Sequence, residues 1–229
     1  MSDKKISTKL ERQRRRQTRQ KIVTYVTIGI IGLAVVAFIW IVVSSSMSNK
    51  PVAGNCKVVP MQFTSPPSMQ IDVKKQYFAT FKMVKGGQFV IQLYPDKAPV
   101  TVNNFVFLAN KGFFNCVTFH RVLEGFMAQA GDPTGTGNGG PGYQIPDEPN
   151  VLQFDKAGVV AMANTGQPNS GGSQFFITFA PQVYLNGGYT IFGQVISGMD
   201  VVNGLTRRDP TQNPTFTGDA IESVTISEK

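Results

Sequence analysis

Four side chains within nine residues could act together at one site. They are Arg121, Phe126, Met127 and Gln129. The arginine falls in an alternating run over residues 119–124, which predicts a half-buried strand, and the other three fall in a second predicted strand over 126–130. Arginine and glutamine supply hydrogen-bond donors, whereas phenylalanine and methionine supply apolar walls. The stretch therefore predicts either a site that holds an apolar group beside fixed donors, or core residues next to a solvated arginine.

Two long motifs favour the site. Residues 119–132 read F-H-R-V-L-E-G-F-M-A-Q-A-G-D, and residues 162–178 read M-A-N-T-G-Q-P-N-S-G-G-S-Q-F-F-I-T. Both resemble signatures of the cyclophilins, the peptidyl-prolyl cis/trans isomerases, and A-P-V-T-V-N-N-F-V-F-L-A over 98–109 resembles the first helix of that family. The resemblance covers residues 75–228. It implies an isomerase, or rotamase, that assists protein folding, here in a bacterial-like, membrane-anchored form.

The resemblance also implies a mechanism without a nucleophile, metal or cofactor. Rotation about an X-Pro bond is slow because amide resonance raises a barrier of about 18–20 kcal/mol. A fixed cation that donates to the prolyl amide as conjugation is lost would stabilise the twisted transition state selectively. By resemblance, Arg121 is this donor and Gln129 hydrogen-bonds the substrate backbone.

Further substrate contacts are assigned by the same resemblance. The walls of the proline pocket are Phe126, Met127, Phe176 and Leu185, and the residues before the proline are held by Ala163, Asn164 and Gln174. Tyr184 and Tyr189 stand where well-known members often carry Trp and His; Tyr189 keeps an aromatic wall, whereas Tyr184 lacks the indole N–H and leaves cyclosporin affinity open. His120 belongs to the signature and is either a substrate contact or a strand histidine bonded to nearby backbone.

Other enzyme classes fit poorly. His120 is the only histidine, and no G-x-S-x-G elbow surrounds a serine, which argues against a Ser-His-Asp hydrolase. One histidine and two distant cysteines lack the spacing of a zinc site. The glycine-rich loop over 135–142 has no G-K-[ST] ending, which argues against a phosphate-binding loop.

The periodicity from Tyr77 onward is mainly that of strands. Alternating or apolar runs predict strands over 77–83, 89–94, 158–163, 189–195 and 220–226, besides the two already named. Helices are predicted over 99–111, opened by Pro99, and over 197–205, opened by Ser197. This pattern indicates a β-barrel or sandwich, and the resemblance implies an eight-stranded antiparallel closed β-barrel capped by two α-helices.

The N-terminal region predicts a membrane anchor. Residues 1–21 form a tail with nine Lys/Arg and two Asp/Glu, and residues 22–43 contain no charge. As a helix this segment would span about 33 Å, enough for a bilayer core of about 30 Å. The positive-inside rule places the tail in the cytoplasm and the catalytic domain outside, as a single-pass membrane protein. A cleaved signal peptide is the alternative, although its apolar region would be shorter.

Residues 44–73, rich in Pro, Ser and Gly, predict a flexible tether before the isomerase domain at 74–229. The two cysteines, Cys56 and Cys116, either pair in an oxidising compartment or remain free thiols.

The expected partners are proline-containing polypeptides and, through residues 22–43, the lipid bilayer. Beyond residue 21 the chain has 13 basic and 12 acidic residues, so we expect no nucleic-acid partner for the domain, which should be monomeric. A proline-peptide-binding or scaffolding module with little turnover is the competing function; the presence of Arg121 and Gln129 favours the enzyme.

Overall fold

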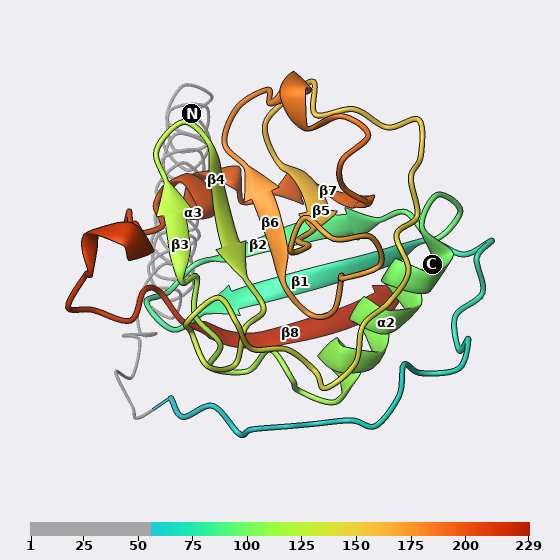
Figure 1. Cartoon of the computed structure of the whole chain (residues 1–229), viewed down its shortest axis with the longest axis horizontal. Helices are drawn as coiled ribbons and strands as arrows, with labels where there is room; N and C mark the ends of the chain where they lie inside the picture. The colour runs from blue at the N-terminus through green and yellow to red at the C-terminus, as the bar shows by residue number, and fades with distance from the viewer. Residues whose placement is uncertain (1–55) are drawn as a thin grey trace, which may run out of the picture. The chain divides into compact units, whose positions relative to one another are not determined.

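Eight strands form one antiparallel sheet in the order β3-β4-β6-β5-β7-β2-β1-β8 (Figure 1). The computed structural model describes residues 56–229. The strands are β1 (Tyr77–Met83), β2 (Gln88–Leu93), β3 (Arg121–Leu123), β4 (Met127–Ala130), β5 (Val159–Met162), β6 (Phe175–Thr178), β7 (Ile191–Ser197) and β8 (Ile221–Glu228). β3, β4 and β6 cross β2, β1 and β8 steeply in Figure 1, so the sheet curls around its core. The chain is therefore mainly β, as the periodicity predicts.

The alternation of strand residues places one set of side chains inside this curl. In β1 every second residue from Tyr77 to Met83 is buried. Phe81 stacks on Phe89 of β2 at 4.6 Å between ring centroids, and Phe175 of β6 lies 5.6 Å from Phe81. The two strands meet through a tight turn in which Gly86 and Gly87 both have positive φ, a conformation that glycine adopts without strain. The core is thus built largely from stacked and edge-on phenylalanines.

The curled sheet is not the closed barrel that the resemblance implied. Among residues 56–229 no strand ladder joins the two edge strands, β3 and β8. Near one end the edges are linked by the loop before β3: Cys116 N–H donates to the Ile221 carbonyl at 2.7 Å, and Ile221 N–H donates to the Val117 carbonyl at 2.9 Å. β3 is only three residues long, which is too short to pair along β8.

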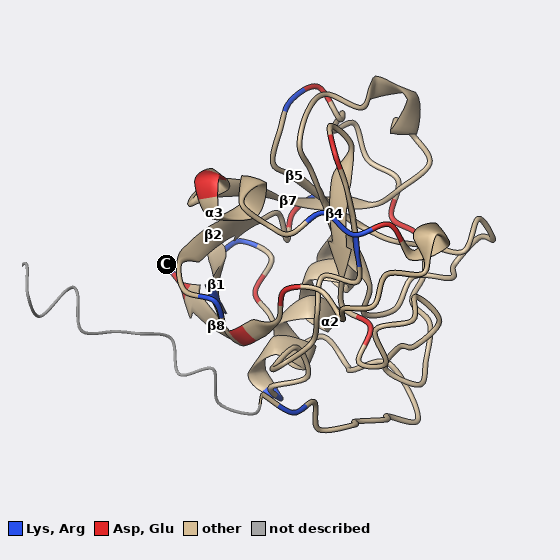
Figure 2. Ribbon diagram, turned by 90° about the vertical axis from the view of Figure 1, so that its left-hand side faces the viewer, with Lys and Arg blue, Asp and Glu red and all other residues tan. Residues whose placement is uncertain are grey.

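Within residues 56–229 two α-helices accompany the sheet, as predicted, and lie on different sides of it in Figure 1 and Figure 2. α2 (Pro99–Asn110) begins with its proline, and Glu148 accepts hydrogen bonds from the N–H groups of Val100 and Thr101. α3 (Met199–Asn203) is shorter than predicted. Its N-cap is Gly198 at φ 77° rather than Ser197, which ends β7. Two short 3-10 helices are η1 (Val183–Leu185) and η2 (Pro210–Gln212).

The part of the predicted tether that the structure describes, residues 56–73, has no helix or strand and runs past β8 and α2 (Figure 1). It is nevertheless held on the domain. Cys56 forms a disulfide with Cys116, and Phe63 and Ile71 pack against the core. The Gln70 N–H donates to Asn103 Oδ1 of α2 at 2.8 Å. From Cys56 onward this segment is therefore docked rather than free.

The predicted basic tail, membrane segment and first part of the tether fall within residues 1–55 and lie outside the described residues. Within residues 56–229 the helices are too short or too polar to cross a bilayer.

Candidate active site

A second apolar cluster lies on the face of the sheet opposite the core. In β6, Phe175 and Ile177 point into the core, while Phe176 joins the outer cluster. In β5, Val160 belongs to the core and Ala161 to the outer cluster. This division follows from the two-residue period of a strand. The buried members of the outer cluster are Met127, Phe154, Val159, Ala161, Phe176 and Ile191.

The strand register aligns the predicted site residues in a row across this outer face. Arg121 of β3 is paired with Gln129 of β4, Gln129 with Phe176 of β6, and Phe176 with Ala161 of β5. Paired residues on antiparallel strands point to the same side, so the arginine, the glutamine and the phenylalanine stand next to one another. Residues 55 positions apart in the chain thereby form one surface.

Arg121 is half-buried, and its side chain has no ion-pair or hydrogen-bond partner among the described residues. Its guanidinium carbon lies 5.6 Å from the centroid of the Phe126 ring, a cation–π distance. Phe126 is itself fixed: its N–H donates to the Leu123 carbonyl at 3.1 Å, and its carbonyl accepts from the Phe179 N–H at 2.9 Å. The ring orients the arginine and leaves its donors available to a ligand.

The apolar side chains that were predicted to wall the proline pocket lie together beside Arg121: Met127, Phe176, Phe126 and Leu185 belong to the outer cluster, and so does Tyr189. Met127 and Phe176 are buried, whereas the others are partly exposed at the rim. Tyr189 packs edge-on against Phe176 at 5.2 Å between centroids. Tyr184 lies at the mouth, 70% exposed, with its ring 6.1 Å from that of Phe126. These side chains therefore form an apolar surface, the candidate proline pocket, whose partly exposed members a small ring can reach from solvent.

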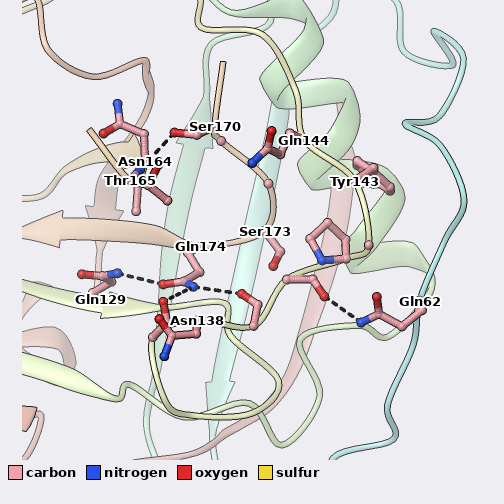
Figure 3. Close-up of a pocket in the computed structure, with 18 residues that line it drawn as sticks. Gln62, Gln129, Asn138, Tyr143, Gln144, Asn164, Thr165, Ser170, Ser173 and Gln174 are labelled. Atoms are coloured by element: carbon pink, nitrogen blue, oxygen red, sulfur yellow. Dashed lines mark hydrogen bonds between the residues drawn. The ribbon is translucent and has the colours of Figure 1, made fainter. Parts of the chain in front are cut away.

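A polar groove of about 870 Å³ adjoins the pocket (Figure 3). Gln129 Nε2 donates to Gln174 Oε1 at 2.8 Å, and Gln174 Nε2 donates to the carbonyls of Gly137 and Gly139, each at 2.9 Å. Ala163 and Asn164 also line the groove, and the Ala163 N–H donates to the Gln174 carbonyl at 2.9 Å. The groove thus contains the residues predicted to hold the part of a substrate before its proline.

The structure does not bring His120 together with the other predicted site residues: it belongs neither to the outer cluster nor to the lining of the groove. The side chain is 2% exposed and lies close to Gly137, beneath the loop after β4. Its Nδ1 atom is buried and has no hydrogen-bond partner among the described residues. Burial lowers the pKa of His120 in spite of the opposing effect of Asp132. The imidazole is therefore neutral at neutral pH.

Several residues of the site were not predicted. Phe154 stacks against Phe176 at 5.8 Å between ring centroids, and Ile191 is a further buried member of the outer cluster. Gln182 Nε2 donates to the Gly125 carbonyl at 2.9 Å and fixes the turn that carries Phe126. Gln62, from the docked segment, lines the groove. Phe154 and Gln182 lie outside the two motifs, and nothing in the periodicity marks them.

This geometry can bind an apolar ring and present a fixed cation to the bond beside it. The described residues contain no group of three or more His, Cys, Asp or Glu side chains placed to hold a metal ion. With a free guanidinium at the pocket edge and hydrogen-bonding amides in the groove, the site is suited to stabilising charge that develops on a bound amide.

Comparisons with known proteins agree with this geometry. The family model described as "Cyclophilin type peptidyl-prolyl cis-trans isomerase/CLD" matches residues 78–226. Peptidyl-prolyl cis-trans isomerase-like 1 of Aspergillus niger is 49% identical over 134 residues, which cover 56% of this chain and 82% of that protein. Peptidyl-prolyl cis-trans isomerase B of Bacillus subtilis is 46% identical over 130 residues, 56% of this chain and 90% of that protein.

Solved structures are similar over the whole domain. A cyclophilin-type peptidyl-prolyl cis-trans isomerase of Cryptosporidium parvum matches with a TM-score of 0.61 and 32% identity, covering 67% of this chain and 99% of that chain. A second structure of that protein, in the presence of the dipeptide Ala-Pro, matches with a TM-score of 0.60 and 32% identity, covering 66% of this chain and 99% of that chain.

Proposed function

The chain belongs to the family of cyclophilin-type peptidyl-prolyl cis-trans isomerases, and from this premise we propose that it accelerates rotation about X-Pro bonds in polypeptides that fold outside the cytoplasm. The observation that carries the proposal is the free Arg121 guanidinium at the edge of an apolar pocket, opposite Gln129 in the sheet. The site therefore combines a place for the proline ring with a donor for the bond that must rotate.

The ground state and the transition state differ in where the amide electrons lie. In the planar amide the nitrogen lone pair is delocalised into the carbonyl, and in the twisted amide it becomes localised on nitrogen. Arg121 can donate to this nitrogen only as the lone pair becomes available. Its hydrogen bond is accordingly stronger in the transition state, which is the condition for acceleration.

The substrate is positioned by the two halves of the site. The proline ring lies on Met127 and Phe176, and the preceding residues extend over Gln129 and Gln174 into the polar groove. The related Cryptosporidium parvum structure was determined in the presence of Ala-Pro, which supports a prolyl ligand for this chain as well. Holding the ring while the acyl side turns removes much of the orientational cost of rotation.

The extracytoplasmic location rests on three features. Residues 1–21 are strongly basic, and residues 22–43 are uncharged and long enough for a membrane anchor, which positions the domain outside. The Cys56–Cys116 disulfide supports an oxidising compartment. The lipid bilayer is thus a partner through residues 22–43, and unfolded chains emerging across it are the substrates.

The test is isomerisation of an Ala-Pro peptide by the full-length protein in mild detergent, with peptide binding followed by NMR line shapes. Arg121→Ala should lower kcat/KM by about 10²–10³, the cost of removing one donor to developing charge, while binding weakens far less. Phe126→Ala should weaken both binding and turnover, because it removes a pocket wall. Lys74→Ala, which removes an exposed cation with no described side-chain bond, is the matched control.

Two outcomes would overturn the proposal. If folded Arg121→Ala isomerises as fast as wild type, the assigned mechanism is wrong. If wild type binds the peptide without turnover, the domain is a binding or scaffolding module.

A further inference from the structure

The docked segment before β1 reaches the groove of the active site. Gln62 is one of the residues that line the groove, on the wall opposite Gln129 and Gln174 (Figure 3). Its Nε2 donates to the Gly140 carbonyl at 2.9 Å, and the Phe63 N–H donates to the Pro141 carbonyl at 2.8 Å. Two neighbouring residues of the segment therefore bond two neighbouring residues of the loop after β4.

Packing fixes this contact from both sides. The Phe63 ring lies 5.1 Å from the Phe107 ring of α2 and 6.4 Å from the Tyr143 ring. Gly142 has a φ of 96°, and a Cβ atom there would lie 2.6 Å from the Phe63 carbonyl oxygen. Segment and loop are so close that only glycine fits between them. The Cys56–Cys116 disulfide ties the start of the same segment to the domain.

The loop, in turn, positions the glutamine pair of the site. Its Gly137 and Gly139 carbonyls accept both described hydrogen bonds of Gln174 Nε2, and Gln174 Oε1 accepts from Gln129. This orients the Gln174 amide unambiguously, because its nitrogen must face the loop and its oxygen must face Gln129. A displacement of the loop would therefore alter the groups that contact a substrate backbone.

We propose that Gln62 and Phe63 are positioning residues for substrate, through which the disulfide-tied segment sets the affinity for peptide residues that precede the proline. The inference rests on the proposed isomerase function. All side chains that line the groove are uncharged, so the favoured ligand is an extended peptide with neutral residues before its proline. Rotation itself remains the task of Arg121, which the segment does not touch.

The experiment compares two peptides with the full-length protein in detergent. Ala-Asn-Ala-Ala-Pro-Phe is long enough to enter the groove, whereas acetyl-Ala-Pro-amide ends before it. Gln62→Ala should raise KM for the long peptide roughly three- to tenfold, the effect expected for one neutral hydrogen bond, with kcat within about twofold. The ratio of kcat/KM for the long peptide to that for the short one should fall by the same factor.

Two further variants control this result. Gln62→Glu has the same shape but cannot donate to the Gly140 carbonyl, so it should shift the ratio in the same direction. Gln70→Ala changes an exposed glutamine of the same segment whose described bond uses only its backbone N–H, and it should leave the ratio unchanged.

An equal loss on both peptides would show that Gln62 only stabilises the fold, and an unchanged ratio in Gln62→Ala would show that it has no part in binding. Either result overturns the proposal. If wild type turns over neither peptide, the isomerase function itself fails, which is a distinct outcome.

Discussion

Arg121 differs from the other two arginines of the described domain in having free donors. Arg207 forms an ion pair with Glu124, and Arg208 donates to the backbone carbonyls of His120 and Phe216. In both arginines the Nε and Nη1 atoms already donate to groups of the protein. A half-buried arginine without a partner gives up hydration that no protein group replaces. A ligand that supplies the missing hydrogen-bond acceptor would offset this desolvation cost.

Asp132 provides a pH-dependent test of the loop that borders the groove. Burial alone would raise the pKa of this fully buried carboxyl group, but hydrogen bonds from Thr134 and from backbone N–H groups, including that of Gly137, outweigh burial and lower it. The stabilisation is therefore present above the unfolded-state pKa of about 3.9 and is lost as pH falls through the lower folded-state value.

Asp132→Asn should accordingly reduce the free energy of unfolding at pH 7 by about 2 kcal/mol, because an amide cannot accept the same set of bonds. The difference from wild type should narrow as pH falls below about 4, because the Asp132 carboxylate of the unfolded chain then protonates while that of the folded protein stays ionised to a lower pH. Denaturant unfolding across pH 3–7 measures this. Asp155→Asn, at an exposed aspartate without a described hydrogen bond, is the control; equal effects of both variants would contradict the assignment.

At this scale the sequence predicts most of the site. Arg121, Gln129 and Phe176 fall in motifs and on alternating strands, so both their identity and their shared face are predictable. The burial of His120 is not predictable, because strand alternation suggests that Phe119 and His120 face opposite sides and that only one of them is buried. Both are buried, since the loop after β4 covers the second side, and no local pattern reveals that covering.

At the scale of elements, removal of the disulfide tests how much the segment before β1 contributes to the stability of the fold. Cys56 and Cys116 are separated by 60 residues. Closing a loop of this length in the unfolded chain is worth up to about 4 kcal/mol in the chain-entropy model. The Cys56→Ser/Cys116→Ser variant should therefore unfold at a lower temperature than the oxidised protein.

Two measurements check this prediction. Alkylation of the denatured, unreduced wild type should leave both cysteines unlabelled, and reductant should lower the melting temperature of wild type but not of the double variant. Two labels per chain before reduction would contradict the pairing.

Element boundaries were harder to predict than element types. Periodicity did not distinguish a barrel from a sandwich, and the resemblance implied a closed barrel, whereas the sheet ends in two edge strands, one of which is the three-residue β3. Ser197 is a good capping residue by type, but pairing with β2 retains it in β7, and Gly198 takes the left-handed turn into α3. Proline and serine in residues 56–73 predict an absence of helix and strand. They do not reveal that Phe63 docks on Phe107. In each case a tertiary contact decides what local sequence leaves open.

At the scale of the whole molecule, charge is separated along the chain. Residues 1–21 carry nine basic and two acidic residues, while the remaining chain is nearly balanced. Figure 2 shows Lys, Arg, Asp and Glu distributed over several parts of the domain. The groove is lined by uncharged side chains, so it offers no charged group that would select among client chains. The proposed membrane attachment depends instead on the charge of residues 1–21, because a basic segment is attracted to an anionic leaflet.

This separation leads to a test of orientation. If the basic tail before residues 22–43 holds the N-terminus in the cytoplasm, as proposed, protease added outside intact spheroplasts should digest the catalytic domain. The tail should become accessible only after lysis. Replacing Arg14, Arg15 and Arg16 by Glu removes three of the nine basic residues before the segment and should shift part of the population toward the reverse orientation. A matched variant with Lys74 and Lys75 changed to Glu, beyond the flanking region that orients the segment, should retain the wild-type pattern. Complete protection of the domain in intact spheroplasts would reverse the proposed topology, and with it the proposal that the substrates fold outside the cytoplasm.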